Sequence, residues 1–169
     1  MTRTDANVAA TKYREPGWFT TQVFNRLVRR LTRMGLSVWG SRELRVRGRS
    51  SGLWRTTPVN LLVVDGERFL VAPRGVTQWV RNLRAAGNGE LRLGRRVEPF
   101  EASELADPDK AAVLRPYLKR WKMEVGVFFD GVDGDATDAE LVAAGANHPV
   151  FRIHGSDPDR PVTPAAAAG

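Results

Sequence analysis

The chain has 169 residues, no cysteine and two histidines, and its 26 basic and 19 acidic side chains give a formal charge of +7. Without cysteine there are no disulfides, thiolate metal ligands or cysteine nucleophiles. Two histidines near the C-terminus leave little room for a histidine-rich metal site or a catalytic triad. The basic balance favours an anionic partner, such as a phosphorylated small molecule, nucleic acid or anionic lipid.

The first regular pattern is an amphipathic helix over residues 17–34, where apolar residues recur at three- and four-residue steps with arginines between them. Residues 1–16 are small and polar and predict a flexible N-terminal segment. They lack a signal-peptide pattern, so a cytoplasmic location is expected. A solvated arginine face is the simpler interpretation of the helix, and peripheral contact with an anionic membrane is the alternative.

The middle of the chain has the pattern of antiparallel strands around one short helix. Asp65-Gly66 is a type I′ turn signal between two apolar runs. A second turn is expected near Gly94-Arg95, and Gly87 is expected to end the helix. The predicted elements are a strand at 43–47, a hairpin at 59–72, a helix at 77–87 and a second hairpin at 89–103.

The C-terminal part predicts two helices and a last strand. A helix over 106–121 is expected to begin with Asp107 as its cap and to be kinked or divided at Pro116. A short capped helix over 137–145 and a strand over 149–155 follow. Residues 156–169 are rich in proline and alanine and predict a disordered tail.

These elements predict an α+β fold, a small antiparallel β-barrel with helices packed outside it, over residues 17–155. A doubly wound parallel sheet is disfavoured, because two-residue turns join only antiparallel strands.

Residues 48–60, GRSSGLWRTTPVN, combine a glycine turn with several hydrogen-bond donors. Glycines permit the positive φ angles with which backbone N–H groups form an anion-binding nest. Guanidinium and hydroxyl groups around it would suit a phosphate. The alternative is a surface hairpin with solvated arginines. The residues concerned are Gly48 and Gly52 for the turn, Arg49, Ser50, Ser51 and Arg55 for the donors, and Pro58, which lacks an N–H and suits an edge or ligand-facing position.

This stretch resembles the signature G-R-x-[ST]-G-x-x-R-x-x-P-[LV] of the deazaflavin-dependent nitroreductase family. A second stretch, at 79–85, is similar to the family's W-x-x-N-L-x-A segment, although Ala86-Gly87 replaces the Asn-Pro that usually follows. The resemblance covers roughly residues 20–154. The matching positions are Gly48, Arg49, Ser51, Gly52, Arg55, Pro58, Val59, Trp79, Asn82, Leu83 and Ala85.

The resemblance implies the split β-barrel of flavin reductases and pyridoxamine-phosphate oxidases. Actinobacterial members of the family use reduced deazaflavin coenzyme F-420. The implied reaction is hydride transfer from this cofactor to an electron-poor small molecule: a quinone, a nitroaromatic or an enone. Two alternatives are an FMN-dependent split-barrel reductase and a non-catalytic module that binds an anionic ligand. A nucleic-acid partner is not expected, since the basic residues are scattered and form no recognised motif.

The resemblance also implies roles for individual residues. The cofactor phosphate would contact Arg49, Ser50, Ser51 and Arg55, although some members carry lysine where Ser50 stands. Pro58, Val59 and Asn60 would border the deazaflavin ring, Arg74 would reach the phosphate or the anionic tail, and Trp79 would lie at the cofactor rim. Hydride transfer requires positioning rather than a nucleophile, so no catalytic residue is assigned.

Four aromatic residues, Trp18, Trp121, Phe128 and Phe129, are candidates for the wall of an acceptor pocket, with core packing as the alternative. Some relatives place tyrosines at Asn60 and within 121–130, so a tyrosine proton donor is not assigned, and solvent is the alternative source. The acidic run over 130–138 suggests a solvated loop rather than calcium ligands, and no metal is expected. His148 and His154 are given no role, and the expected state is a monomer or homodimer.

Overall fold

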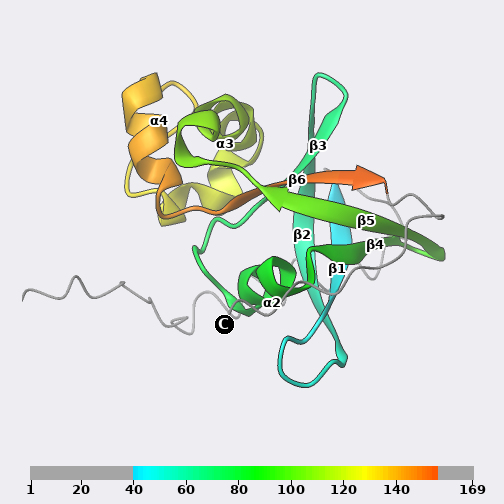
Figure 1. Cartoon of the computed structure of the whole chain (residues 1–169). Helices are drawn as coiled ribbons and strands as arrows, with labels where there is room; N and C mark the ends of the chain where they lie inside the picture. Colours follow the sequence, from blue (N-terminus) through cyan, green and yellow to red (C-terminus); the bar gives the residue numbers. More distant parts are fainter. Residues whose placement is uncertain (1–39, 156–169) are drawn as a thin grey trace, which may run out of the picture. The chain divides into compact units, whose positions relative to one another are not determined.

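Antiparallel strands close into a barrel in the computed structural model, which describes residues 40–155 (Figure 1). Around the barrel the strands follow the order β1-β2-β3-β6-β5-β4, and β4 pairs back with β1. This confirms the predicted α+β barrel. The strands are β1 Ser41–Arg47, β2 Trp54–Val64, β3 Glu67–Val71, β4 Asn88–Leu93, β5 Arg96–Glu104 and β6 Val150–Gly155.

The described residues all belong to one unit of the chain, Ser37–Gly169. The predicted segments 1–16 and 156–169, the helix over 17–34 and the candidate pocket residue Trp18 lie outside residues 40–155. Within residues 40–155, no helix is sufficiently long and apolar to span a bilayer.

Both predicted hairpin turns are confirmed. Asp65 and Gly66 have φ angles of 51° and 81°, the two positive values that a type I′ turn requires. Gly94 and Arg95 separate β4 from β5, and Gly94 has a φ of 57°. The two-residue turns fix the register of each hairpin and with it the alternation of inward and outward side chains.

Strand β2 begins earlier than expected. Trp54 already pairs with Arg47 of β1, so the loop is confined to residues 48–53. The pairing of β2 with β3 starts only at Leu61, so residues 54–60 pair with β1 and extend past the end of β3. Pro58 lies in this part of β2, where a residue without an N–H is tolerated.

Three α-helices and two short 3-10 helices lie in the described range. The helix α2, Gln78–Ala86, ends as predicted at Gly87, whose φ is 68° and whose N–H bonds to Leu83. It packs against β1 and β4, whereas α3 contacts α4, β2 and β3 (Figure 1). The other helices are η1 Asp107–Asp109, α3 Ala111–Val125, η2 Gly126–Phe128 and α4 Asp138–Gly145.

Two details of the helix predicted over 106–121 are wrong. Asp107 does not cap it: its carboxylate accepts from the Nζ of Lys110 at 2.6 Å, and η1 precedes α3. Pro116 does not divide it either, and the residue with non-helical dihedrals is Trp121. Leu114 and Tyr117 are buried on either side of Pro116, and this packing offsets the hydrogen bond that proline removes.

Two apolar cores follow from the strand alternation. The first fills the barrel and is completed by Val80 and Leu83 of α2. The second lies between the outer face of the barrel and α3 with α4. Strand β3 serves both, because Leu70 points into the barrel core while Phe69 and Val71 belong to the outer one. The barrel is therefore a rigid support for the loop between β1 and β2.

Candidate functional site

The loop between β1 and β2 is closed by its own backbone. The N–H of Gly48 donates to Leu53 O at 2.8 Å, and the N–H of Gly52 donates to Gly48 O at 2.8 Å. Gly52 has the expected positive φ of 66°, but Gly48 does not. The predicted nest is therefore wrong in one respect, because these two N–H groups are spent inside the loop. The N–H of Leu53 is also used, by the hydroxyl of Ser51 at 3.3 Å.

Arg49 is fastened to α2 by two amide side chains. Its Nη1 donates to Gln78 Oε1 at 2.9 Å and to Asn82 Oδ1 at 3.0 Å, and its backbone N–H donates to the same Asn82 oxygen at 3.2 Å. Asn82 is buried, with 5% exposure. The Arg49 side chain is nevertheless exposed, as are Ser50 and Ser51. These donors remain accessible to a ligand.

Arg55 lies beside the loop in β2. Its side chain is exposed, and a Cβ added at Gly48 would meet Arg55 Cγ at 3.7 Å. Arg55 therefore lies next to the loop that contains Arg49, and both side chains are exposed.

The base of the loop is held by two further arginines that sequence reasoning did not single out. The guanidinium carbons of Arg45 and Arg47 lie 4.9 Å and 4.2 Å from the Trp54 ring centroid. Arg47 also donates to Gly52 O at 3.0 Å, and Arg45 pairs with Glu90 at 2.6 Å. Cation–π contacts of this kind contribute about 0.5–1 kcal/mol at exposed sites. They fix the two strand ends from which the loop emerges.

The three residues expected to border a ring lie together on the part of β2 that extends past β3. Val59 is buried in the barrel core, and Pro58 and Asn60 are partly exposed. The side chain of Asn60 lies near the hydroxyl of Tyr117 on α3, a residue that sequence reasoning missed. Burial raises the pKa of the Tyr117 hydroxyl well above its usual range, and the Asn60 contact opposes this only in part. The hydroxyl therefore stays protonated at neutral pH.

Arg74 and Trp79 occupy different surroundings. Arg74 is exposed in the turn before α2, where Gly75 has a φ of 75°. Trp79, on α2, is half-buried, and its ring lies 5.8 Å from that of Phe151.

Two of the candidate pocket aromatics belong to the outer core. Trp121 and Phe129 are each 2% exposed, and Trp121 packs on Tyr117 with ring centroids 5.0 Å apart. Phe128 is partly buried against the same cluster. Burial to this degree favours the core interpretation for Trp121 and Phe129.

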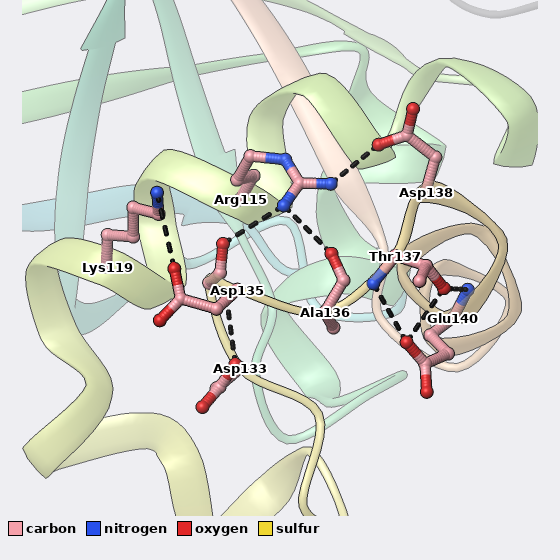
Figure 2. Close-up of polar contacts among 9 residues, drawn as sticks. Arg115, Lys119, Asp133, Asp135, Ala136, Thr137, Asp138 and Glu140 are labelled. Carbon is pink, nitrogen blue, oxygen red and sulfur yellow. Dashed lines mark hydrogen bonds and ion pairs between the residues drawn. The ribbon is translucent and has the colours of Figure 1, made fainter.

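The acidic run over 130–138 is held by basic residues of α3 (Figure 2). Arg115 donates to Asp138 at 2.6 Å and to Ala136 O at 2.8 Å, and Lys119 lies 3.5 Å from Asp135. The carboxylates of Asp133, Asp135 and Asp138 are thus each engaged by a cation of α3. Within the described part of the chain, no group of three acidic or histidine side chains could hold a metal ion.

His148 is a buried core residue. It is 7% exposed and stacks on Phe129 with centroids 3.9 Å apart. Burial lowers the pKa of its imidazole; the Ala72 and Pro73 backbone and the Asp130 charge act in the opposite direction, and the Lys110 charge acts in the same one. The folded protein therefore favours the neutral ring.

Unfolding is expected to become easier as the pH falls below the ordinary histidine value of about 6.5. The unfolded chain binds a proton there that folded His148 resists, so the stabilisation is present above that pH and is lost below it. Urea unfolding of the wild type and of His148→Gln at pH 7.5 and 5.5 measures this. One proton limits the slope to about 1.4 kcal/mol per pH unit, and an equal slope in the variant would contradict the assignment.

A closed antiparallel barrel with flanking helices is a split β-barrel fold like that of F420-H2-dependent reductases. Residues 13–133 match the F420H(2)-dependent quinone reductase family, and the chain belongs to that family. It is a deazaflavin-dependent reductase of the quinone-reductase type, and its cofactor is reduced coenzyme F-420. No curated protein matches the chain at a significant level.

Two solved structures support the fold. A protein titled "Structure of F420-H2 Dependent Reductase (FDR-A)" is 18% identical, and the match covers 68% of this chain and 94% of that one with a TM-score of 0.50. A second, described as a domain-swapped dimer, is 17% identical over 79% of this chain and 98% of that one, also with a TM-score of 0.50.

Proposed function

We propose that the loop 48–53 and Arg55 bind the phosphate of coenzyme F-420, and that Pro58, Val59 and Asn60 border its deazaflavin ring. The observation that carries this proposal is the exposure of Arg49, within one closed loop, and of Arg55 beside it. Two guanidiniums and the hydroxyls of Ser50 and Ser51 form a donor set suited to phosphate oxygens. Arg74 and Trp79 are proposed to contact the cofactor's anionic tail and its rim, respectively.

The donor chemistry of the loop fits the cofactor's phosphate. Arg49 has no carboxylate within ion-pair distance among residues 40–155, and the same holds for Arg55. Their charges are thus available to an anion. Further along, the backbone of β2 from Trp54 to Asn60 has β1 on one side and extends beyond β3 on the other. Backbone polar groups on an unpaired strand edge can bind the polar atoms of a ring.

The proposed reaction is transfer of one hydride to a small-molecule acceptor, for which we favour a quinone and consider nitroaromatics and enones next. Reduced coenzyme F-420 supplies the hydride when bound. The residues of this chain bind and orient the reactants and keep water from the reacting face. The Tyr117 hydroxyl lies near the Asn60 side chain. A quinone that accepts the hydride takes one proton from solvent to become a hydroquinone. No nucleophilic residue is needed.

The remaining partner predictions are also proposals. One of the structures that the fold resembles is described as a domain-swapped dimer, which favours a homodimer over a monomer for this chain. A cytoplasmic location with peripheral membrane contact through residues 17–34 suits an enzyme whose acceptor is a lipid-soluble quinone. Trp18 in that segment is proposed to contact the acceptor.

A fluorescence titration with oxidised coenzyme F-420, followed by turnover of the reduced form with menadione, a nitroaromatic and an enone, tests the proposed function. Saturable quenching and reoxidation with menadione are expected. FMN is titrated in parallel. Retention of FMN with no binding of the deazaflavin would favour the FMN-dependent alternative, and binding of neither would leave a non-catalytic anion-binding module.

A further inference from the structure

Arg49 differs from the ion-paired arginines of the described residues in the charge of its partners. Six arginines of residues 40–155 pair with carboxylates, whereas both acceptors of the Arg49 side chain are neutral amide oxygens, from Gln78 and Asn82. The carboxylate pairs are Arg45–Glu90, Arg68–Glu98, Arg84–Glu104, Arg92–Glu43, Arg115–Asp138 and Arg152–Glu67.

The difference matters electrostatically. A carboxylate at hydrogen-bond distance cancels the guanidinium charge and competes with an incoming anion. An amide oxygen accepts the same hydrogen bond through its dipole and leaves the full positive charge in place. The amides at 78 and 82 therefore hold Arg49 without neutralising it.

The contacts of Arg49 also leave the Nε and Nη2 atoms of its guanidinium available to a ligand. Both amide oxygens bind Nη1, so Nε and Nη2 have no acceptor among the residues that the structure describes. These two nitrogens form one edge of the planar guanidinium, and such an edge binds two oxygens of a phosphate in parallel.

Asn82 fixes the residue at two points. Its Oδ1 accepts from the backbone N–H of Arg49 at 3.2 Å as well as from Nη1 at 3.0 Å. Asn82 is itself immobilised, since it is 5% exposed and its neighbour Leu83 is 1% exposed in the barrel core. The rotamer entropy that Arg49 would lose on binding a ligand is thereby lost already on folding.

We propose that Asn82, assisted by Gln78, is a positioning residue that orients Arg49 for the cofactor phosphate and preserves its charge. This inference rests on the proposed function of the loop. Asn82 acts through Arg49 and touches no reacting atom. The identity of residues 78 and 82 as amides, rather than carboxylates, determines that this position binds an anion.

Asn82→Asp and Gln78→Glu test the proposal, because each replaces an amide by a carboxylate of nearly the same shape. Each variant can still accept the bonds of Arg49, so a purely structural role predicts unchanged coenzyme affinity. We expect instead that the dissociation constant for oxidised coenzyme F-420 rises about tenfold to a hundredfold, with a shallower dependence on salt. The melting temperature of Gln78→Glu, whose side chain is exposed, should stay near that of the wild type.

Met123→Glu is the matched control, since it changes the net charge by the same amount on α3 at a residue with 96% exposure. If Gln78→Glu and Asn82→Asp bind the coenzyme no more weakly than Met123→Glu does, the proposal is wrong. Should Asn82→Asp fail to fold because its charge is buried, Gln78→Glu alone decides.

A second probe separates this inference from the proposed function. Inorganic phosphate is titrated into the same proteins while the backbone amide signals of Arg49 and Ser50 are followed by NMR. If the wild type binds phosphate but not the coenzyme, and Gln78→Glu loses the phosphate binding, the positioning role of Gln78 and Asn82 is supported and the cofactor site is rejected. If both variants bind the coenzyme as tightly as the wild type, the positioning role of Asn82 and Gln78 is rejected, and the proposed cofactor site is not.

Discussion

Arg49→Leu is expected to weaken the binding of coenzyme F-420 by about tenfold to a hundredfold, the effect of losing a charge-assisted hydrogen bond to an anion. The fold should tolerate the change. Asn82 Oδ1 is buried, but it keeps the backbone N–H of residue 49 as a donor at 3.2 Å and is not left unsatisfied. The free energy of unfolding should therefore change by less than about 1 kcal/mol.

Fluorescence titration and urea unfolding of the same preparation measure the two quantities. Arg95→Leu is the control, because Arg95 is also exposed and lies at the β4–β5 turn. It should bind the coenzyme as the wild type does. Equal losses in both variants would show that the overall positive charge, and not the loop, attracts the cofactor.

Trp121→Ala is expected to lower the free energy of unfolding by about 3–5 kcal/mol, the usual cost of removing a large aromatic side chain from a core. Trp121 is 2% exposed and packs against Tyr117 at 5.0 Å. Its ring would also lie 3.5 Å from a Cβ added at Gly40, so it fills the space between α3 and the start of β1. The cavity left behind could not close without moving the helix.

Chemical denaturation measures this, with Met123→Ala as the control on the same helix. Met123 is 96% exposed, so its truncation should change stability by less than about 0.5 kcal/mol. The folded fraction of Trp121→Ala should retain most of its affinity for the coenzyme. If the variant is as stable as the wild type but no longer turns over the acceptor, the result would support a role for Trp121 in the acceptor pocket.

Much of the candidate site was predictable from short-range pattern. The glycines and the two arginines of residues 48–55 follow one another in the sequence, so a tight loop flanked by guanidiniums needs no distant contact. The family's motif identified the same residues. The partners of Arg49, however, lie 29 and 33 positions further along the chain, and no local periodicity indicates that Gln78 and Asn82 meet it.

Errors arose where tertiary packing changed a local expectation. Asp107 was expected to cap a helix, but its carboxylate pairs at 2.6 Å with the buried ammonium of Lys110. That ammonium is also held by the distant Gly145 O at 2.8 Å. The aromatic residues at 121 and 129 suited a pocket as well as a core by sequence, and the sequence could not predict their burial at 2%, which favours the core. Tyr117 was missed for the same reason, since its contact with Asn60 joins α3 to β2.

The sequence by itself determined the turns, the strand alternation and the chemical character of the loop, because those depend on φ preferences, on the two-residue period of a strand and on the side chains present. The tertiary structure decided which N–H groups of the loop already donate hydrogen bonds within it. It also decided that the charge of Arg49 is not neutralised by a carboxylate. Closing the barrel brings α2 against β1, and a hydrogen bond between residues so far apart in the chain exists only once that packing has formed.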